Sequence, residues 1–276
     1  MENKDPLPLH ILPDIQFLAA DEQLTFGEHF DSHRINFYAV VWFIEDHNLH
    51  YIDFEPFPIK KNQVFLIAKN QVHAIPTVEL PAAKVMVFSS DFFHAIEDTY
   101  LKQLFLPFDN QGIEIPKNML PVMEGLFSLI LAEYRDQAEL PLLLKYTSSF
   151  LLLLHRFAAH HSPARYKRDA RIVALLQLIE KHFREQKPVS FYAAHFGLTS
   201  KRANEILKDA FGFSINALSQ QLLTLEAKRA LYNGVHSIKE IAYQLGFSDQ
   251  SYFSRFFRKH TGISPEKFRS QFANRV

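Results

Sequence analysis

The chain contains no cysteine, and this absence excludes several kinds of protein. No disulfide, thiol nucleophile or cysteine-based zinc site can form. The first ten residues, MENKDPLPLH, are polar and interrupted by proline, so they lack the apolar core of a secretory signal. The most apolar run, residues 150–154, is too short to span a bilayer and has charged neighbours in Lys145 and Arg156. We therefore expect a cytoplasmic protein with no membrane partner.

The formal net charge of zero conceals a strong asymmetry along the chain. Residues 1–165 carry 12 Lys and Arg against 21 Asp and Glu, whereas residues 166–276 carry 18 against 9. A basic region of this kind is typical of nucleic-acid binding, because neutralising phosphates releases counterions. Attraction between the two halves is an alternative reason for the asymmetry, and both can hold.

The acidic half contains two patterns of apolar residues. Short alternating runs rich in β-branched and aromatic residues predict strands at residues 37–44, 49–54, 62–68 and 84–89. Strands at this spacing without intervening helices indicate a β-sandwich or barrel. Residues 121–137 and 140–161 instead predict two helices that are apolar on more than one face, so each must be buried against the β region or a second copy of the chain.

The basic half contains a divided repeat. Residues 189–214 (VSFYAAHFGLTSKRANEILKDAFGFS) are echoed by residues 238–264 (IKEIAYQLGFSDQSYFSRFFRKHTGIS). Each copy has a short apolar helix, a glycine beside an apolar residue, a second helix with polar and basic side chains, and a Gly-x-Ser stop. This is the pattern of a helix-turn-helix, whose second helix lies in the DNA major groove. The repeat indicates a DNA-binding protein and not an enzyme.

Three further elements complete the basic half. Residues 170–183 predict its first helix, with apolar residues on one stripe. A long helix over residues 214–232, capped by Ser214 and ended by Gly234, separates the two motifs, and Ser237 caps the helix that follows. The polar, basic segment before this half contains Pro163 and predicts a linker.

These motifs resemble the AraC/XylS family of bacterial transcription regulators. The resemblance covers roughly residues 170–272 and is carried by Ile241-Ala242, Gly246-Phe247, Tyr252-Phe253, Phe257-Arg258 and Gly262-x-Ser264-Pro265. The segments HRINFYAVVWFIED and HYIDFEPFPIKKNQVFLIAKNQVHAI resemble the cupin-like sensory domains of the same family. The implied fold is a two-domain α+β protein, with an N-terminal cupin-like β-barrel and helical pair and a C-terminal all-α double helix-turn-helix domain.

The resemblance also implies a domain plan and a set of partners. The expected divisions are a sensory barrel at 1–110, a dimerising helical pair at 111–162, a linker at 163–169 and a DNA-binding domain at 170–276, with motifs at about 188–212 and 237–262. The expected partners are double-stranded DNA, a second copy of the chain, a small-molecule effector and RNA polymerase. Activation of transcription is favoured, because the family consists mostly of activators.

The recognition helix of the second motif is expected over about residues 249–260. Its aromatic residues Tyr252, Phe253, Phe256 and Phe257 are predicted to pack on Ile241, Ala242 and Leu245. The side chains left facing outward are Gln250, Ser251, Ser254 and Arg255, which match the base-contacting positions of the family. Glutamine can pair with adenine and arginine with guanine through two hydrogen bonds.

The recognition helix of the first motif is expected over about residues 200–211, with Ala203, Ile206 and Leu207 buried. The outward set is Lys201, Arg202, Asn204 and Glu205. Several relatives of the family have a basic or long polar residue where Glu205 stands. Its carboxylate could accept from cytosine N4 or pair with Lys201 on the preceding turn. Phosphate contacts are predicted from Ser190, Ser237, Arg258, Lys259 and the helix N-termini.

The acidic half raises the alternative of a metal-dependent cupin enzyme fused to a DNA-binding domain. Metal-binding cupins use a His-x-His pair, but the residue two positions after His33 is Ile35, and His29, His47, His50 and His73 form no such pair. We therefore expect no metal, cofactor or catalytic residue, and this alternative also leaves the basic half unexplained.

An effector pocket is the other possible role of a barrel interior. The predicted lining is Phe37, Tyr38, Trp42, Tyr51 and Phe65, with His33 or His73 orienting a small, partly apolar molecule. Two alternatives remain open: these aromatic residues only fill the barrel, or this half of the chain serves only to dimerise.

Overall fold

The computed structural model describes residues 9–11, 16–21, 32–77, 80–107, 109–161 and 170–273. The chain divides into two compact units, one of residues Pro8–Arg168 and one formed mainly by Asp169–Val276. The predicted linker at 163–169 lies outside the described residues. Among the described residues, no helix combines the length and the apolar character needed to cross a membrane.

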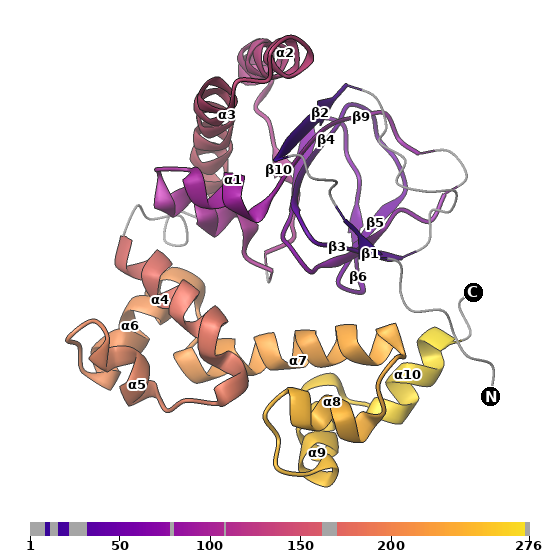
Figure 1. Cartoon of the computed structure of the whole chain (residues 1–276), viewed down its shortest axis with the longest axis vertical. Helices are drawn as coiled ribbons and strands as arrows, with labels where there is room; N and C mark the ends of the chain where they lie inside the picture. The colour runs from indigo at the N-terminus through magenta and orange to yellow at the C-terminus, as the bar shows by residue number, and fades with distance from the viewer. Residues whose placement is uncertain are drawn as a thin grey trace. The chain divides into compact units, whose positions relative to one another are not determined.

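The first unit contains two five-stranded sheets that curve around a common interior (Figure 1). The first sheet has the order β1 (Leu9–His10), β3 (His33–Ile35), β8 (Val72–Ala74), β5 (Leu49–Ile52) and β6 (Glu55–Pro58). The second has the order β10 (Ile113–Glu114), β7 (Gln63–Ile67), β4 (Tyr38–Phe43), β9 (Ala83–Phe88) and β2 (Phe17–Ala20). The four predicted strands are confirmed as β4, β5, β7 and β9.

Strand β4 divides its side chains between two apolar cores, because successive residues of a strand point to opposite faces. Ala39 and Phe43 belong to the core between the sheets, together with Ile52 from the first sheet. Val40 and Trp42 face the other way and pack against the helices of this unit. Trp42 is completely buried there.

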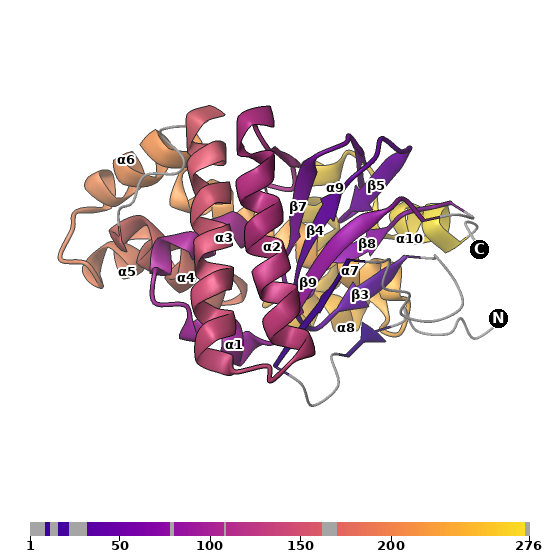
Figure 2. The same ribbon diagram turned by 90° about the horizontal axis from the view of Figure 1, so that it is seen from above.

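Five helical segments follow the sheets or lie between their last strands. They are α1 (Ser90–Ala95), η1 (Thr99–Phe105), η2 (Lys117–Met119), α2 (Leu120–Arg135) and α3 (Leu140–His161). The predicted pair of long helices is confirmed as α2 and α3, which lie side by side (Figure 2). Phe127 of α2 and Phe150 of α3 lie 6.3 and 6.1 Å from the Trp42 ring. The β region is therefore one of the partners against which the pair is buried.

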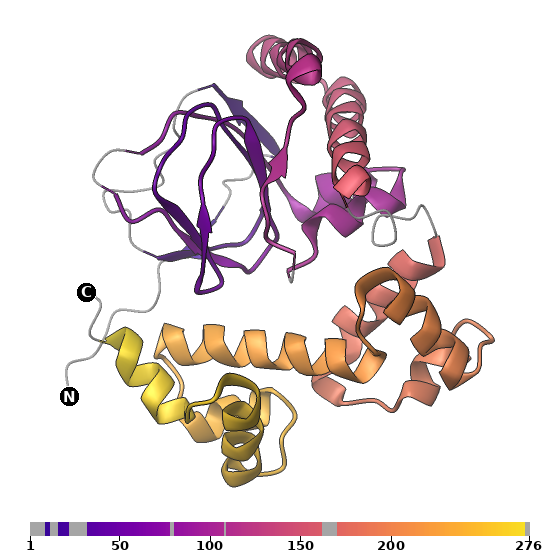
Figure 3. The same cartoon turned by 180° about the vertical axis from the view of Figure 1, so that it is seen from behind.

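The second unit is entirely helical in its described residues. Its segments are α4 (Ala170–His182), η3 (Phe183–Glu185), α5 (Val189–Ala194), α6 (Ser200–Phe211), α7 (Ile215–Asn233), α8 (Ile238–Gln244), α9 (Gln250–Thr261) and α10 (Pro265–Ala273). Helix α7 contacts α4, η3 and α6 through one part of its length and α8 to α10 through the other (Figure 3). Because it packs on both bundles, its buried residues are distributed around the helix instead of forming one stripe.

The predicted helix boundaries of this unit are also confirmed. Ser214 caps α7, its hydroxyl accepting the backbone N–H of Ala217, and Gly234 ends the helix with a φ of 73°. A left-handed residue at this position is the usual end of a helix, and glycine adopts it without steric cost. Ser237 caps α8.

Candidate nucleic-acid interface

Helix α6, the predicted first recognition helix, is amphipathic. Thr199 caps its N-terminus by accepting the backbone N–H of Arg202. The helix buries Ala203, Ile206 and Leu207, the stripe that its sequence predicts. Its opposite face is polar, with exposed Lys201 and Arg202 in the first turn.

Asn204 has a different role from the predicted one. Its carboxamide oxygen accepts the backbone N–H of Ile215 at 3.0 Å, and the residue is partly buried. The amide of Ile215 is one of the N–H groups that a helix leaves without an intrahelical partner. Asn204 therefore joins the recognition helix to the start of α7, and its side chain oxygen is not directed outward as expected.

Glu205 forms an ion pair, but with a different partner from the one considered in the sequence. The pair is with Arg202, Nη1 to Oε2 at 3.1 Å, and not with Lys201. Residues three apart on a helix are neighbours on its surface, as are residues four apart. Both side chains are about half exposed, so this pair competes with any base that either would contact.

Helix α9, the predicted second recognition helix, begins at a well-formed cap. A carboxylate oxygen of Asp249 accepts the backbone N–H of Tyr252 at 2.7 Å. Phe253 and Phe257 are completely buried, as predicted. Gln250, Ser251 and Arg255 are exposed and Ser254 is partly buried, so three of the four predicted base-reading side chains are fully accessible.

Tyr252 lies on the surface, whereas the sequence predicted it in the core. Its side chain is 47% exposed, because the buried residues of α9 are Phe253 and Phe257, four positions apart, and Tyr252 falls beside that stripe. The guanidinium carbon of Arg255 lies 6.0 Å from the Tyr252 ring centroid. A second tyrosine, Tyr243 on α8, is 52% exposed, so two aromatic side chains lie on the surface of this motif.

Of the predicted phosphate-contacting residues, three are exposed and one is engaged elsewhere. Ser190, Arg258 and Lys259 are exposed. Ser237 forms a capping box, its hydroxyl accepting the backbone N–H of Glu240 while its own N–H is donated to the Glu240 carboxylate. The bond from the Ser237 backbone lowers the pKa of Glu240, so the N-terminus of α8 already holds a negative charge.

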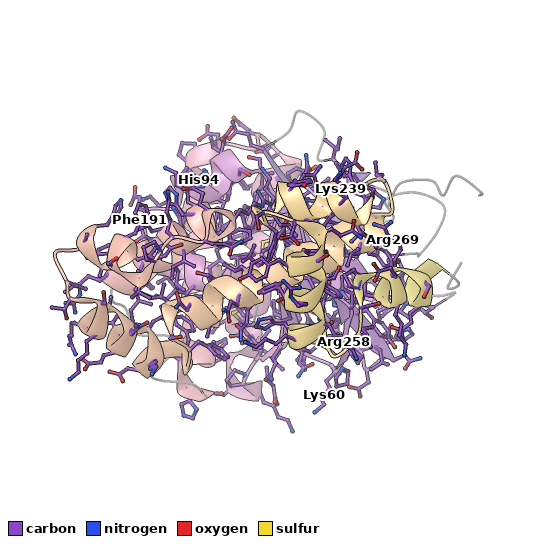
Figure 4. The ribbon with its side chains drawn as sticks, turned by 90° about the horizontal axis from the view of Figure 1, so that it is seen from below. Lys60, His94, Phe191, Lys239, Arg258 and Arg269 are labelled. Carbon is purple, nitrogen blue, oxygen red and sulfur yellow. The ribbon has the colours of Figure 1, made fainter. Side chains whose placement is uncertain are left out.

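One further cation near this terminus was not predicted. Lys239 is exposed on α8, and Figure 4 shows Lys239 and Arg258 extending from the two helices of the second motif. Short helices offer few positions for a sequence pattern to separate buried from exposed faces. The exposure of Lys239 is therefore decided by the packing of α8 on α7 and α9.

The first unit contains a cluster of histidines on the inner face of its first sheet. His33 lies opposite His73 in the register, and His73 lies opposite Ile52, which belongs to the core between the sheets. Residues that are paired across neighbouring strands share a face. His50 is buried beside His73, with Nε2 of His50 3.4 Å from Nδ1 of His73, and His10 stacks on His33.

Burial favours the uncharged forms of His50 and His73. It lowers the pKa of His50 to about 3, with the neighbouring His33 adding to the effect. Burial also lowers the pKa of His73 well below its ordinary value, and His33, His50 and His10 act in the same direction. The described ranges contain no group of three or more His, Asp or Glu side chains arranged to hold a metal ion. His29 lies outside the described residues.

The residues predicted to line an effector pocket are not brought together. Phe37 and Phe65 lie in the core between the sheets, on the side of His33 and His73. Tyr38 and Trp42 belong instead to the core formed with the helices. Tyr51 neighbours His50 and Ile52 on β5, which face inward, so it points to the opposite face. The predicted set contains aromatic residues from both faces of the sheets, because their sequence positions were grouped without regard to the face on which each side chain lies.

Comparison with known proteins identifies the second unit and relates the whole chain to a known regulator. A family described as "Helix-turn-helix domain" matches residues 192–271, which include both recognition helices. The HTH-type transcriptional activator RhaS of Salmonella schwarzengrund is 25% identical over 249 residues, which cover 87% of each chain. RhaS of Salmonella agona matches to the same extent. The chain is a DNA-binding transcription regulator, and its expected resemblance to the AraC family is confirmed.

The chain also aligns with solved structures. ToxT of Vibrio cholerae, bound to (E)-4-(8-methylnaphthalen-1-yl)but-3-enoic acid, aligns over 94% of this chain and 100% of that chain, with 15% identity and a TM-score of 0.46. The C-terminal domain of the response regulator yesN of Fusobacterium nucleatum aligns over 35% of this chain and 94% of that domain, with 28% identity and a TM-score of 0.33.

Proposed function

We propose that this regulator reads two adjacent segments of the DNA major groove, one with α6 and one with α9. The observation that carries the proposal is the duplicated motif, in which each recognition helix leaves polar side chains exposed near its N-terminus. Helix α7, which joins the motifs, has 19 residues. At 1.5 Å per residue it is about 28 Å long. This length is comparable with the roughly 34 Å that separates successive major-groove segments on one face of DNA.

The exposed side chains define a reduced set of base contacts. Lys201 and Arg202 are proposed to act from α6, and Gln250, Ser251 and Arg255 from α9, because all five are accessible. Ser190, Arg258 and Lys259 are proposed to hold the phosphate backbone, which positions a protein on DNA without specifying sequence. Asn204 and Ser237 are left out, since both are engaged in hydrogen bonds within the protein.

We further propose that the first unit responds to a small effector and that the regulator activates transcription in the cytoplasm together with RNA polymerase. The inner-face residues His33, His73, Phe37 and Phe65 are the candidates for effector contact, since these predicted residues share one side of the sheets. The activator names of the RhaS relatives support the sign of regulation. Added metabolites are expected to change transcription of a reporter gene. Substitution of His73 is expected to abolish this response.

A homodimer is proposed through α2 and α3. Val122 and Leu129 on α2 are 46% and 48% exposed, and Leu142 on α3 is also exposed. Large apolar side chains gathered on neighbouring helices are typical of a protein interface. Sedimentation of the full chain at micromolar concentration is expected to give a dimer, and Leu129→Glu is expected to give a monomer. A wild-type monomer would contradict the proposal.

The two-segment reading is tested by selecting binding sites from a random DNA library with the full chain. The expected product is a motif of two short boxes whose centres lie about one helical turn apart. A single recovered box would mean that one motif alone reads bases. Repetition with Arg202→Ala and Arg255→Ala proteins assigns each box to a helix, since each variant is expected to lose information in one box only.

A further inference from the structure

The turn glycines of the two motifs adopt the same conformation in different surroundings. Gly197 in the first motif and Gly246 in the second follow the first helix of each repeat, with φ values of 60° and 81°. Positive φ is costly for residues other than glycine, so a side chain at either position meets a similar backbone penalty. The conformation therefore explains why each motif has a glycine, but it does not distinguish the two positions.

The neighbours of these glycines do distinguish them. A Cβ atom at Gly197 would meet nothing within 4 Å. A Cβ atom at Gly246 would lie 2.1 Å from the carbonyl oxygen of Arg184, far inside the van der Waals limit. Arg184 belongs to η3, which follows α4 in the bundle of the first motif. The bundle of the first motif therefore touches the turn of the second, and only glycine leaves room for this contact.

Hydrogen bonds hold the two sides of this contact. The Gln186 side chain donates from Nε2 to the Gly246 carbonyl oxygen at 3.4 Å. The Arg184 guanidinium donates to Glu226 of α7 at 2.9 Å, and the other carboxylate oxygen of Glu226 accepts from Arg229 at 2.6 Å. Arg229 is buried, and buried pairs of this kind order their surroundings more than exposed ones do. The η3 segment is thus attached to α7 and to the turn at Gly246.

We propose that the contact of Arg184 and Gln186 with Gly246 is a brace that fixes the orientation of α9 relative to α6 and thereby sets the spacing of DNA boxes that the regulator accepts. The proposal rests on the proposed reading of two boxes. Helix α7 joins the two motifs and packs on α8, α9 and α10 of the second bundle. The contact of Arg184 with the turn at Gly246 is a further connection between the bundles, and it restricts rotation of the second bundle about α7. Gly246 and Arg184 are positioning residues in this arrangement, because they act through α9.

The brace is tested by binding of the full chain to DNA in which the two selected boxes are separated by one base pair fewer, one more or two more than the preferred spacing. The wild type is expected to lose about tenfold in affinity at each wrong spacing, the loss of roughly one base contact. Gly246→Ala is expected to bind the three wrong spacings and the preferred one within about threefold of one another. Gly197→Ala is the matched control, since it has the same backbone penalty without the contact, and it should keep the wild-type profile.

Separate outcomes contradict the brace and the two-box reading. A Gly246→Ala protein that binds DNA with the sharp wild-type profile overturns the brace. A wild type that is indifferent to spacing overturns the two-box reading. Circular dichroism would detect a failure of Gly246→Ala to fold. In that case the Arg184→Ala, Gln186→Asn double variant tests the brace, because it keeps both glycines. Its profile should flatten, and a profile as sharp as that of the wild type overturns the brace.

Discussion

The carboxamide oxygen of Asn204 accepts the backbone N–H of Ile215 at 3.0 Å, so the middle of recognition helix α6 is bonded to the first residue of α7. The same amide would otherwise be an unpaired donor at the start of a buried helix. The bond fixes the angle at which the recognition helix leaves the connecting helix. Asn204 is therefore left out of the proposed base contacts.

Asn204→Ala is therefore expected to lower the stability of the second unit by about 1 kcal/mol, the usual cost of losing a helix-capping side chain. The selected DNA motif should keep its base preferences, because the Asn204 oxygen is engaged by the backbone of Ile215. Asn204→Asp retains the acceptor and should unfold at nearly the wild-type urea concentration. Loss of preference at one base position in Asn204→Ala, with unchanged stability, would contradict this role.

Glu205→Ala is expected to increase affinity for specific and random DNA alike. Its carboxylate pairs with Arg202 and repels the phosphates, so its removal makes this face of α6 more positive. One unit of positive charge gained toward the phosphates should steepen the dependence of log affinity on log salt by about 0.9. The measurement is a salt titration by fluorescence anisotropy. Asp209→Ala, an exposed acid on the same helix, is the control for loss of charge alone. A loss confined to sites that contain a particular cytosine would instead indicate that Glu205 reads the base.

Arg255→Ala and Lys259→Ala are expected to affect DNA binding in different ways. Arg255 lies in the first half of α9 beside Tyr252, and its loss should cost about 1–3 kcal/mol and relax specificity at one base position. Lys259 lies near the C-terminal end of α9, and its loss should weaken all sequences alike and reduce the salt slope by about 1. Competition of specific against random DNA measures both effects. Equal losses on the two kinds of DNA for both variants would refute the assignment.

The histidine cluster is expected to make the first unit less stable in acid. Burial lowers the pKa of His50 from its ordinary value of 6.5, which applies to the unfolded chain, to about 3 in the folded chain. Below pH 6.5 the unfolded chain therefore takes up a proton that the folded chain does not. Stability present above pH 6.5 is lost as the pH falls toward 3, by about 2 kcal/mol at pH 5 for this residue. His73 should contribute with the same sign, because its pKa is also lowered.

Urea unfolding between pH 7.5 and 5 measures this effect. The chain has one tryptophan, Trp42, which is buried in the first unit, so its fluorescence reports on that unit alone. His50→Gln should reduce the change of stability with pH whatever its effect on stability at pH 7.5. His94→Gln, at an exposed histidine on α1, is the matched control. An unaltered pH dependence in His50→Gln would show that the folded and unfolded chains protonate His50 alike.

Much of the secondary structure follows from local patterns in the sequence. The alternation around Trp42 and the apolar runs before His161 suffice to predict four strands and the two long helices of the first unit. Shorter strands such as β3 and β8 were not predicted, because three residues carry too little alternation to be recognised. They form because the sheet supplies hydrogen-bond partners from elsewhere in the chain.

The facing of side chains was predicted less completely. Tyr38 and Phe37 are adjacent and aromatic, yet they belong to different cores, since one residue of difference reverses the face of a strand. Tyr252 and Phe253 differ in the same way on α9, where the burial stripe passes through only one of them. In each pair both residues are aromatic and adjacent in the chain. Only the packing of neighbouring elements decides which core each residue joins, or whether it is buried.

The sequence by itself determined the duplicated motif, the position and caps of both recognition helices, and the division of charge between the two halves, because these depend on residues close together in the chain. Only the tertiary structure decided the partners of those residues. Asn204 accepts the backbone N–H of Ile215 at the start of α7, and Gly246 meets Arg184, more than sixty residues earlier in the chain. Such contacts depend on how the helices pack. A polar side chain can form hydrogen bonds with several kinds of partner, and the fold determines which partner lies within reach.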